Sequence, residues 1–150
     1  MLDRDDKTVD SIERHVSAIF HPIITTMVNN KWIRNAYAND YKLKREIEAL
    51  LVVIPTKHQG ALETLLLDAI SEDSYDAAIV EQAGLFVDKT KSIASKYIGS
   101  RRLELKAHLG VTWAIKYPEK VFRFMDEQLR SVEWEKSTVL KECFGKLVEI

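Results

Sequence analysis

Apolar residues recur along this chain at intervals of three and four, the spacing of one face of an α-helix. The pattern predicts about nine short helices. The first five carry, in order, Ile12, Val16 and Phe20; Ile24, Met27, Val28 and Trp32; Leu43, Ile47, Leu50, Leu51 and Ile54; Ala61, Leu62, Leu65, Leu66 and Ala69; and Ile79, Val80, Ala83, Phe86 and Val87. The last four carry Ile93, Tyr97 and Ile98; Leu103, Leu109, Val111, Trp113 and Ala114; Val121, Phe122, Met125 and Leu129; and Val139, Leu140, Cys143 and Leu147.

Helix-boundary residues fit this division. Asp10 with Glu13 three residues later has the form of a capping box at the start of the first helix. Pro22 and Pro118 suit the first turns of the second and eighth helices. Pro55 ends the third, because the residue before a proline is pushed out of the α-helical region. The polar stretch 35–40 is expected to be a loop.

Composition narrows the fold class to all-α. The chain has 150 residues, enough for one domain over residues 1–150, with only five glycines and three prolines. An all-β fold would need more turn residues. The single cysteine, Cys143, excludes an internal disulfide and a CxxC zinc site.

Nothing in the sequence indicates a membrane partner. The N-terminus is acidic where a secretory signal is basic and then apolar. The longest strongly apolar run, residues 49–54, is far shorter than the roughly 20 residues that cross a bilayer. We therefore expect a cytoplasmic protein.

An internal repeat emerges when the sequence is shifted against itself by about sixty residues. Leu51 then falls on Val111, and Ile54 falls on Ala114. Further matches in the same register are Leu43 with Leu103, Ala61 with Val121, Leu62 with Phe122, Leu65 with Met125, Ile79 with Val139, Val80 with Leu140, Ala83 with Cys143 and Val87 with Leu147. One register serving three helices predicts repeated helical hairpins.

The C-terminal part resembles a HEAT-like or armadillo-like helical pair. The resemblance rests on a helix ending at 113–116, a helix opening at 117–120, and the stretch 131–134 that leads into a third. It implies an α-solenoid in which hairpins stack and share a core. In HEAT-like proteins the concave face usually binds a protein or a nucleic acid, so the resemblance implies a binding role.

The net charge of −1 conceals two segregated segments. Residues 58–88 hold no lysine or arginine but seven acidic residues, namely Glu63, Asp68, Glu72, Asp73, Asp76, Glu81 and Asp88. Residues 89–120 hold Glu104 and Glu119 against eight basic residues, namely Lys89, Lys91, Lys96, Arg101, Arg102, Lys106, Lys116 and Lys120. Adjacent zones of opposite charge either neutralise one another or steer a partner. The binding candidates are Lys89, Lys91, Lys96, Arg101, Arg102, Lys106, Glu72, Asp73 and Asp76.

Candidate chemistry is sparse. Arg102 and His108 resemble the Arg-x(4–6)-His motif of HEPN-type ribonucleases, which implies metal-independent RNA cleavage with the arginine stabilising phosphate charge. Arg14 and His21 fit the same loose spacing. The four histidines lack the partners that a zinc site requires, and no cofactor or metal is expected.

The remaining distinctive side chains are expected in the core. Trp32, Trp113 and Trp134 suit core or interface anchors. Cys143 suits a buried, inert thiol, and the spacing of Tyr97 with Ile93 also places that tyrosine in the core.

Three functional hypotheses follow. The first is a non-enzymatic α-helical repeat module that binds another macromolecule, a protein above all, in an adaptor or immunity-type role. The second is a HEPN-like ribonuclease that uses Arg102 and His108. The third is a helical array that binds nucleic acid through residues 89–120, against which stands the pI of about 6.4.

Overall fold

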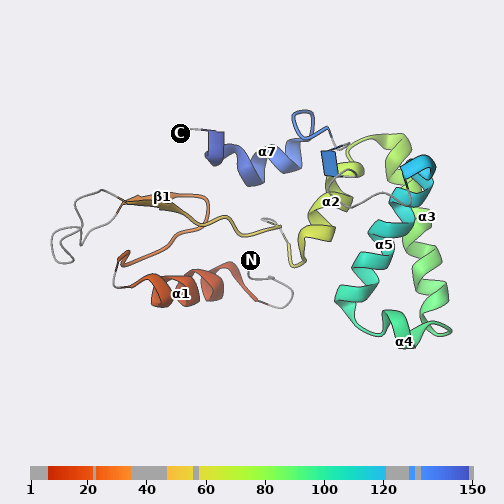
Figure 1. Cartoon of the computed structure of the whole chain (residues 1–150), viewed down its shortest axis with the longest axis horizontal. Coiled ribbons are helices and arrows are strands. Elements are labelled where there is room, and N and C mark those ends of the chain that lie inside the picture. The colour runs from red at the N-terminus through yellow and green to blue at the C-terminus, as the bar shows by residue number, and fades with distance from the viewer. Residues whose placement is uncertain are drawn as a thin grey trace. The chain divides into compact units, whose positions relative to one another are not determined.

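A computed structural model describes residues 7–21, 23–34, 47–55, 58–120, 129–130 and 133–148. The chain divides into two compact units (Figure 1). Unit 1 comprises residues 1–60 and 142–150, and unit 2 comprises residues 61–141. Each unit has its own cluster of buried apolar residues. The prediction of one domain over residues 1–150 stays a prediction.

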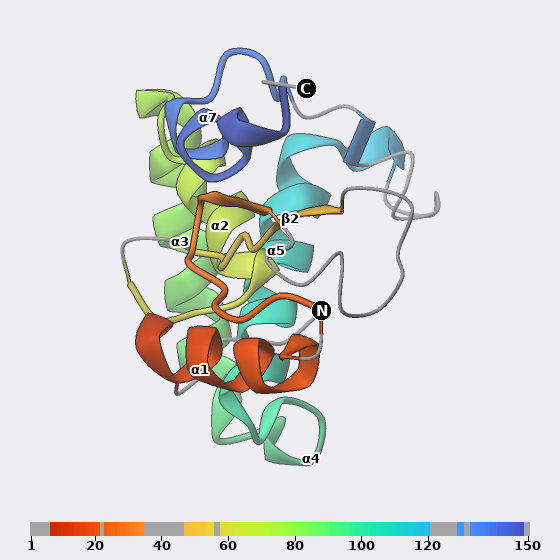
Figure 2. The ribbon, with the colours of Figure 1, turned by 90° about the vertical axis from the view of Figure 1, so that its left-hand side faces the viewer.

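Unit 1 packs a helix against a two-stranded antiparallel sheet. Helix α1 spans Val9–Phe20, and strands β1 (Trp32–Arg34) and β2 (Glu48–Leu50) pair with Ile33 opposite Ala49. Figure 2 shows these elements facing the viewer. The core contains Ile12, Val16, Ile24, Met27 and Val53. It joins one face of α1 to extended chain on either side of the strands.

The start of α1 differs from the predicted capping box. Thr8 is the N-cap, and its hydroxyl accepts a hydrogen bond from the Ser11 amide at 3.2 Å. Asp10 lies in the first turn, and the Glu13 carboxylate accepts from the Asn29 amide at 2.6 Å. The prediction that Asp10 caps the helix is therefore wrong, because a hydroxyl residue two positions earlier satisfies a free amide of the first turn.

The second and third predicted helices are also wrong. Residues 23–31 are turn and extended chain, and Trp32 lies in β1. The stretch predicted as the third helix contains strand β2. Short apolar runs fit a helix or a strand equally well by periodicity, and the β-branched run Val52–Ile54 favours extended chain. Ile24 and Met27 are nevertheless buried. Pro22, residues 35–40 and Leu43 lie outside the described residues.

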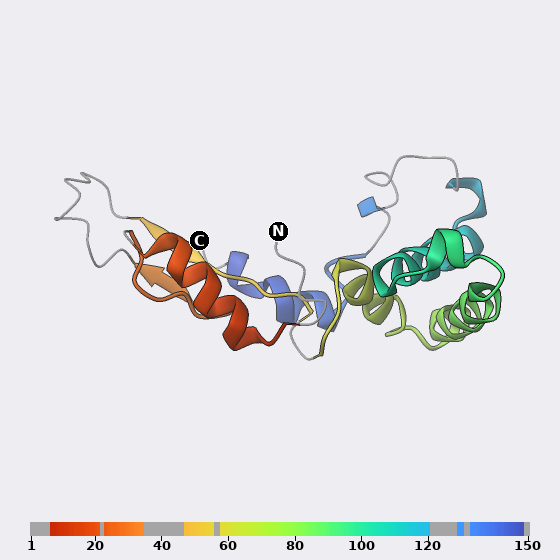
Figure 3. The same cartoon turned by 90° about the horizontal axis from the view of Figure 1, so that it is seen from below.

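Unit 2 is helical throughout its described elements. Helix α2 spans Leu62–Ile70, α3 spans Ser74–Lys91, α4 spans Ser95–Ile98 and α5 spans Arg101–Lys116. Helices α3 and α5 run antiparallel side by side, with α4 where α3 ends and α5 begins (Figures 1 and 3). Leu66, Leu67, Ile70, Leu109 and Trp113 form the core. These helices confirm the fourth, fifth and seventh predicted ones.

A close contact brings α3 against α5. The His108 ring of α5 lies over Gly84 of α3, where a Cβ atom would approach the ring to 3.0 Å. The Nε2 atom of His108 is 2.7 Å from the Val80 carbonyl oxygen. Gly84 therefore leaves room for a histidine that ties the two helices together.

The C-terminal elements confirm the ninth predicted helix. A 3₁₀ turn, η1, covers Pro118–Lys120, helix α7 spans Thr138–Phe144, and a second 3₁₀ turn, η2, covers Gly145–Val148. Leu140 and Cys143 are buried, as their periodicity predicted. Most of the eighth predicted helix, residues 121–128, lies outside the described residues.

The described chain is mostly helical, in broad agreement with an all-α fold, apart from the β1–β2 pair. The sixty-residue register does not hold in its first part, where β2 would match residues 108–110 of helix α5. In its last part, the register pairs Ile79 with Val139, and both of these residues lie in helices. Among the described residues, no helix combines the length and the apolar character that spanning a membrane requires.

Candidate functional site

Unit 2 contains a cleft of about 520 Å³ where α3 begins and α5 ends. Its wall combines the end of α2, the first turn of α3 and residues 133–137. The lining residues are Ala69, Ile70, Glu72, Asp73, Asp76, Lys116, Tyr117, Glu133, Lys136 and Ser137. The cleft thus gathers all three acidic residues that the sequence singled out for binding.

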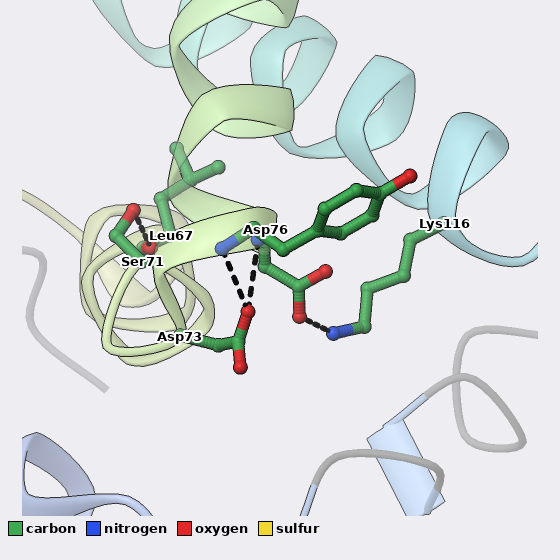
Figure 4. A network of polar contacts seen from close by, with 6 residues as sticks. Leu67, Ser71, Asp73, Asp76 and Lys116 are labelled. Atoms are coloured by element: carbon green, nitrogen blue, oxygen red, sulfur yellow. Dashed lines mark hydrogen bonds and ion pairs between the residues drawn. The ribbon is translucent and has the colours of Figure 1, made fainter.

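Two of these acidic side chains stabilise the folded structure, one as a helix cap and one in an ion pair. The Asp73 carboxylate caps α3, accepting from the amides of Tyr75 and Asp76 at 2.9 and 3.1 Å (Figure 4). The Asp76 carboxylate forms an ion pair with Lys116 of α5, and both side chains are largely shielded from solvent. Asp76 and Lys116 come from the acidic and the basic segment, respectively, so these segments neutralise one another at this point.

The third acidic residue, Glu72, holds the start of α7. Its carboxylate accepts hydrogen bonds from the amides of Thr138 and Val139, both at 3.0 Å. Partial burial raises the pKa of Glu72, but hydrogen bonds from the Ser137 hydroxyl and from these two amides outweigh it and lower the pKa below its ordinary value. Free amides at a helix start attract a negative charge. Glu72 is thus a structural anchor.

The lysines of the cleft are paired as well. Burial lowers the pKa of Lys116, but the hydrogen bond to Asp76 and the nearby charges raise it overall, above its ordinary value. The Lys136 ammonium lies 2.8 Å from the Glu133 carboxylate. The charges that line the cleft are therefore committed largely to one another and to helix ends.

The opposite end of the α3–α5 pair has a different character. The residues from Lys89 to Lys106 include the end of α3, all of α4 and the start of α5, and we call this region the tip. Ile93 is 87% exposed and Tyr97 is 70% exposed. The prediction that Tyr97 lies in the core is wrong, because α4 has a single turn and offers no second face to bury.

The tip also holds six basic residues, Lys89, Lys91, Lys96, Arg101, Arg102 and Lys106. Lys91 pairs with Glu104 at 2.6 Å, and the Lys96 ammonium lies 5.4 Å from the centre of the Tyr97 ring. Lys89, Arg101 and Lys106 are exposed and form no ion pair with any residue in the described ranges. With Arg102, also exposed, they make the tip strongly basic.

Two cationic residues in the first turn of α5 are unfavourable for the stability of that helix. Ser100 is a good N-cap, accepting from the Leu103 amide at 3.4 Å. Arg101 and Arg102 follow in the first turn, where the positive end of the helix dipole disfavours cations by about 0.3–1 kcal/mol each. A basic pair at this position does not serve helix stability, and such local conflicts are expected at functional sites.

The structure does not bring Arg102 and His108 together within the chain. Both lie on α5, six residues apart, which separates them by about 120° around the helix and about 9 Å along it. Arg102 is exposed, whereas His108 is half-buried and its ring contacts the Val80 carbonyl oxygen of α3. Arg14 and His21, the other pair with this spacing, are both exposed on unit 1.

Other reactive side chains are dispersed. His15, His21 and His58 are exposed, and Cys143 is buried as predicted. Trp113 is a core residue, while Trp32 and Trp134 donate hydrogen bonds to the carbonyls of Lys146 and Leu129. Within the described ranges, no group of three or more histidine, cysteine, aspartate or glutamate side chains could hold a metal ion.

Sequence reasoning missed the apolar half of the tip. It selected the basic residues but assigned Ile93 and Tyr97 to a helix core. The available signal was the short interval between Lys91 and Ser100, which is too short for a helix with a well-developed amphipathic face. The cleft residues Tyr117, Glu133 and Lys136 gave no signal, because tertiary packing alone assembles them.

Comparison of the chain with protein-family models, with curated proteins and with solved structures gave no match.

Proposed function

We propose that this protein is a non-enzymatic helical binding module, and that its tip is the surface that docks a protein partner. The observation that carries the proposal is the exposure of Ile93 and Tyr97 in a region of the chain that also carries six basic residues. Exposed apolar side chains within a charged rim are typical of interaction surfaces. The partner would present an acidic rim around an apolar patch.

The contrast with the cleft supports this choice. Acidic residues there cap helices or pair with lysines, so binding a basic partner would disturb the fold. Lys89, Arg101 and Lys106 need give up no ion pair with the described part of the chain. Complementary charge accelerates association and selects the partner, and the apolar residues supply contact area.

The proposal keeps the HEAT-like interpretation in a limited form. Helices α3 and α5 would act as one helical hairpin of the kind that α-solenoids stack, in a cytoplasmic adaptor or immunity-type protein. The binding surface would be the turn end of that hairpin.

Nucleic acid is the second candidate, favoured by Lys89, Arg101 and Lys106, which form no ion pair with the described residues. Phosphate binding would require the lysines and arginines but not Ile93 or Tyr97. The two candidates therefore differ in which residues they need. They also differ in salt dependence, which is steep for a nucleic-acid complex.

The test is affinity capture from an extract of the native cell, with the full chain immobilised. Three baits are compared: wild type, the tip variant Ile93→Ser/Tyr97→Ser, and the control Ile115→Ser, which alters a residue 52% exposed near the other end of α5. We expect a protein that wild type and control retain and the tip variant loses. Equal capture by all three baits contradicts the proposal. Nuclease-sensitive capture that survives in the tip variant supports nucleic acid instead.

A further inference from the structure

The turn formed by residues 133–136 has the surface chemistry that the tip would bind. A hydrogen bond from the Lys136 amide to the Glu133 carbonyl oxygen, 2.9 Å long, closes this turn. Trp134 is 36% exposed, and its two neighbours along the chain, Glu133 and Glu135, are exposed as well. Among the exposed large apolar side chains of the described residues, Trp134 alone has an exposed acidic residue on each side. The 133–136 turn therefore offers an apolar contact with an acidic rim.

The glutamates of the 133–136 turn are less committed to the fold than the acidic residues that cap helices at the cleft. Glu135 forms no ion pair with any residue in the described ranges. Glu133 pairs with Lys136, but the two side chains are 68% and 76% exposed. Exposed pairs of this kind contribute little to stability. A basic partner can therefore bind both glutamates without displacing a helix cap.

The Trp134 ring is held in place before a partner binds. Its indole nitrogen donates a hydrogen bond to the Leu129 carbonyl oxygen at 2.9 Å, and the Leu129 side chain packs against the core of unit 2. An aromatic ring with a fixed orientation loses little conformational entropy on binding, and tryptophan is enriched among the residues that dominate interfaces. Trp134 is thus a preorganised contact for the exposed apolar side chains of the tip.

The tip and the 133–136 turn lie at opposite ends of the α3–α5 pair. Glu133 and Lys136 line the cleft where α3 begins and α5 ends, whereas the tip lies where α3 ends and α5 begins. Helix α5 has 16 residues and is about 24 Å long. The two surfaces of one chain are therefore too far apart to touch, and contact between them requires two copies.

We propose that the tip of one copy of this chain docks on the 133–136 turn of a second copy. The proposal rests on the proposed function, because it takes the tip as a docking surface. Ile93 and Tyr97 contact Trp134, while the basic residues of the tip face the two glutamates. The second copy and the partner proposed for the tip compete for the same surface, so self-association withdraws the tip at high concentration.

Such an interface is heterologous, because it joins different surfaces of the two copies. Each bound pair keeps one free tip and one free turn, so association continues head to tail until a ring closes. Both surfaces are small, and we expect a dissociation constant in the range of about 10 µM to 1 mM. Opposite charges across the interface make the association weaker at high salt.

Mixing two half-competent variants tests this contact. The tip variant Ile93→Ser/Tyr97→Ser keeps the turn, and the turn variant Glu133→Lys/Glu135→Lys keeps the tip. Sedimentation velocity on the full chain at up to about 1 mM should show self-association of wild type. Each variant alone should associate at least about tenfold more weakly. An equimolar mixture of the two should form a 1:1 complex and nothing larger, because a single competent contact remains.

A charge-matched control accompanies the turn variant. Asp10→Lys/Glu81→Lys makes the same change in net charge at exposed acidic residues outside the turn, and should self-associate as wild type does. Helical circular dichroism of all variants should match that of wild type, because every altered side chain is exposed. A mixture in which the two half-competent variants stay separate overturns the proposal, as does a turn variant that self-associates undiminished.

The affinity capture described above separates this inference from the proposed function. A bait can retain further copies of the chain through either surface, so these copies are counted apart from other proteins. Wild type that stays monomeric at about 1 mM, while another protein is captured through the tip, overturns the self-association alone. A tip variant that self-associates as wild type does, and captures other proteins equally, overturns both.

Discussion

The two ends of the α3–α5 pair use charge in different ways. At the cleft end, Asp73 caps a helix, Glu72 anchors α7 and Asp76 pairs with Lys116. At the tip, Lys91 pairs with Glu104, while Lys89, Arg101 and Lys106 form no ion pair with the described residues. Glu72, Asp73 and Asp76 are therefore committed to the fold, whereas these three basic residues of the tip remain available to a partner. Charge segregation in a sequence does not reveal this difference, because capping and pairing depend on tertiary geometry.

Breaking the ion pair at the cleft end should have the largest effect on stability. Asp76→Ala leaves the partly buried Lys116 without its carboxylate, and hydrogen bonds to charged groups are worth about 1.5–3 kcal/mol. We expect a loss of that order in the free energy of unfolding, measured by urea denaturation. The matched control is Lys136→Ala, which removes an exposed pair in the same cleft and should change stability by less than about 1 kcal/mol. Equal losses for the two variants would refute the structural role of Asp76.

Acid should weaken the anchor between Glu72 and α7. The pKa of Glu72 in the folded protein lies below its ordinary value, so the carboxylate stabilises the fold above that ordinary value. This stabilisation falls away as the pH drops through the lowered pKa. The stability difference between wild type and Glu72→Gln should therefore be largest near neutral pH and shrink toward pH about 3. Denaturant titrations over that range measure it, and a pH-independent difference would show that charge is not involved.

The smallest stability effect is expected at the tip, and with the opposite sign. Arg101→Glu replaces a cation by an anion in the first turn of α5, which should raise stability by about 0.3–1 kcal/mol. The same change should weaken binding of an acidic partner. Thermal melts combined with the capture assay measure both effects. A destabilised Arg101→Glu would mean that the arginine serves the fold, contrary to the comparison of the two ends.

Long amphipathic segments were predictable from the sequence. Helices α1, α2, α3, α5 and α7 all fall where periodicity placed them, because each is long enough, at about two turns or more, to bury one face. The two failures involve short apolar runs around Met27 and Val53, whose partners come from distant parts of the chain. A strand of three residues carries too few positions for its period to stand out.

The candidate site was predictable only in its charges. The six bases of the tip were visible in the sequence, but the exposure of Ile93 and Tyr97 was not, since an apolar residue beside a helical pattern is normally assigned to the core. Likewise, the local sequence around Glu72 does not indicate that its carboxylate binds the amides of Thr138 and Val139, which lie 66 and 67 positions further along the chain. Contacts between segments so far apart depend on the folded chain.

Capture by the tip variant tests the central claim most directly. Ile93→Ser/Tyr97→Ser removes two exposed side chains, so its free energy of unfolding should stay within about 0.5 kcal/mol of wild type. The account predicts that this stable variant no longer retains the protein partner that wild type and Ile115→Ser both retain. Undiminished capture of that partner by the tip variant would contradict it.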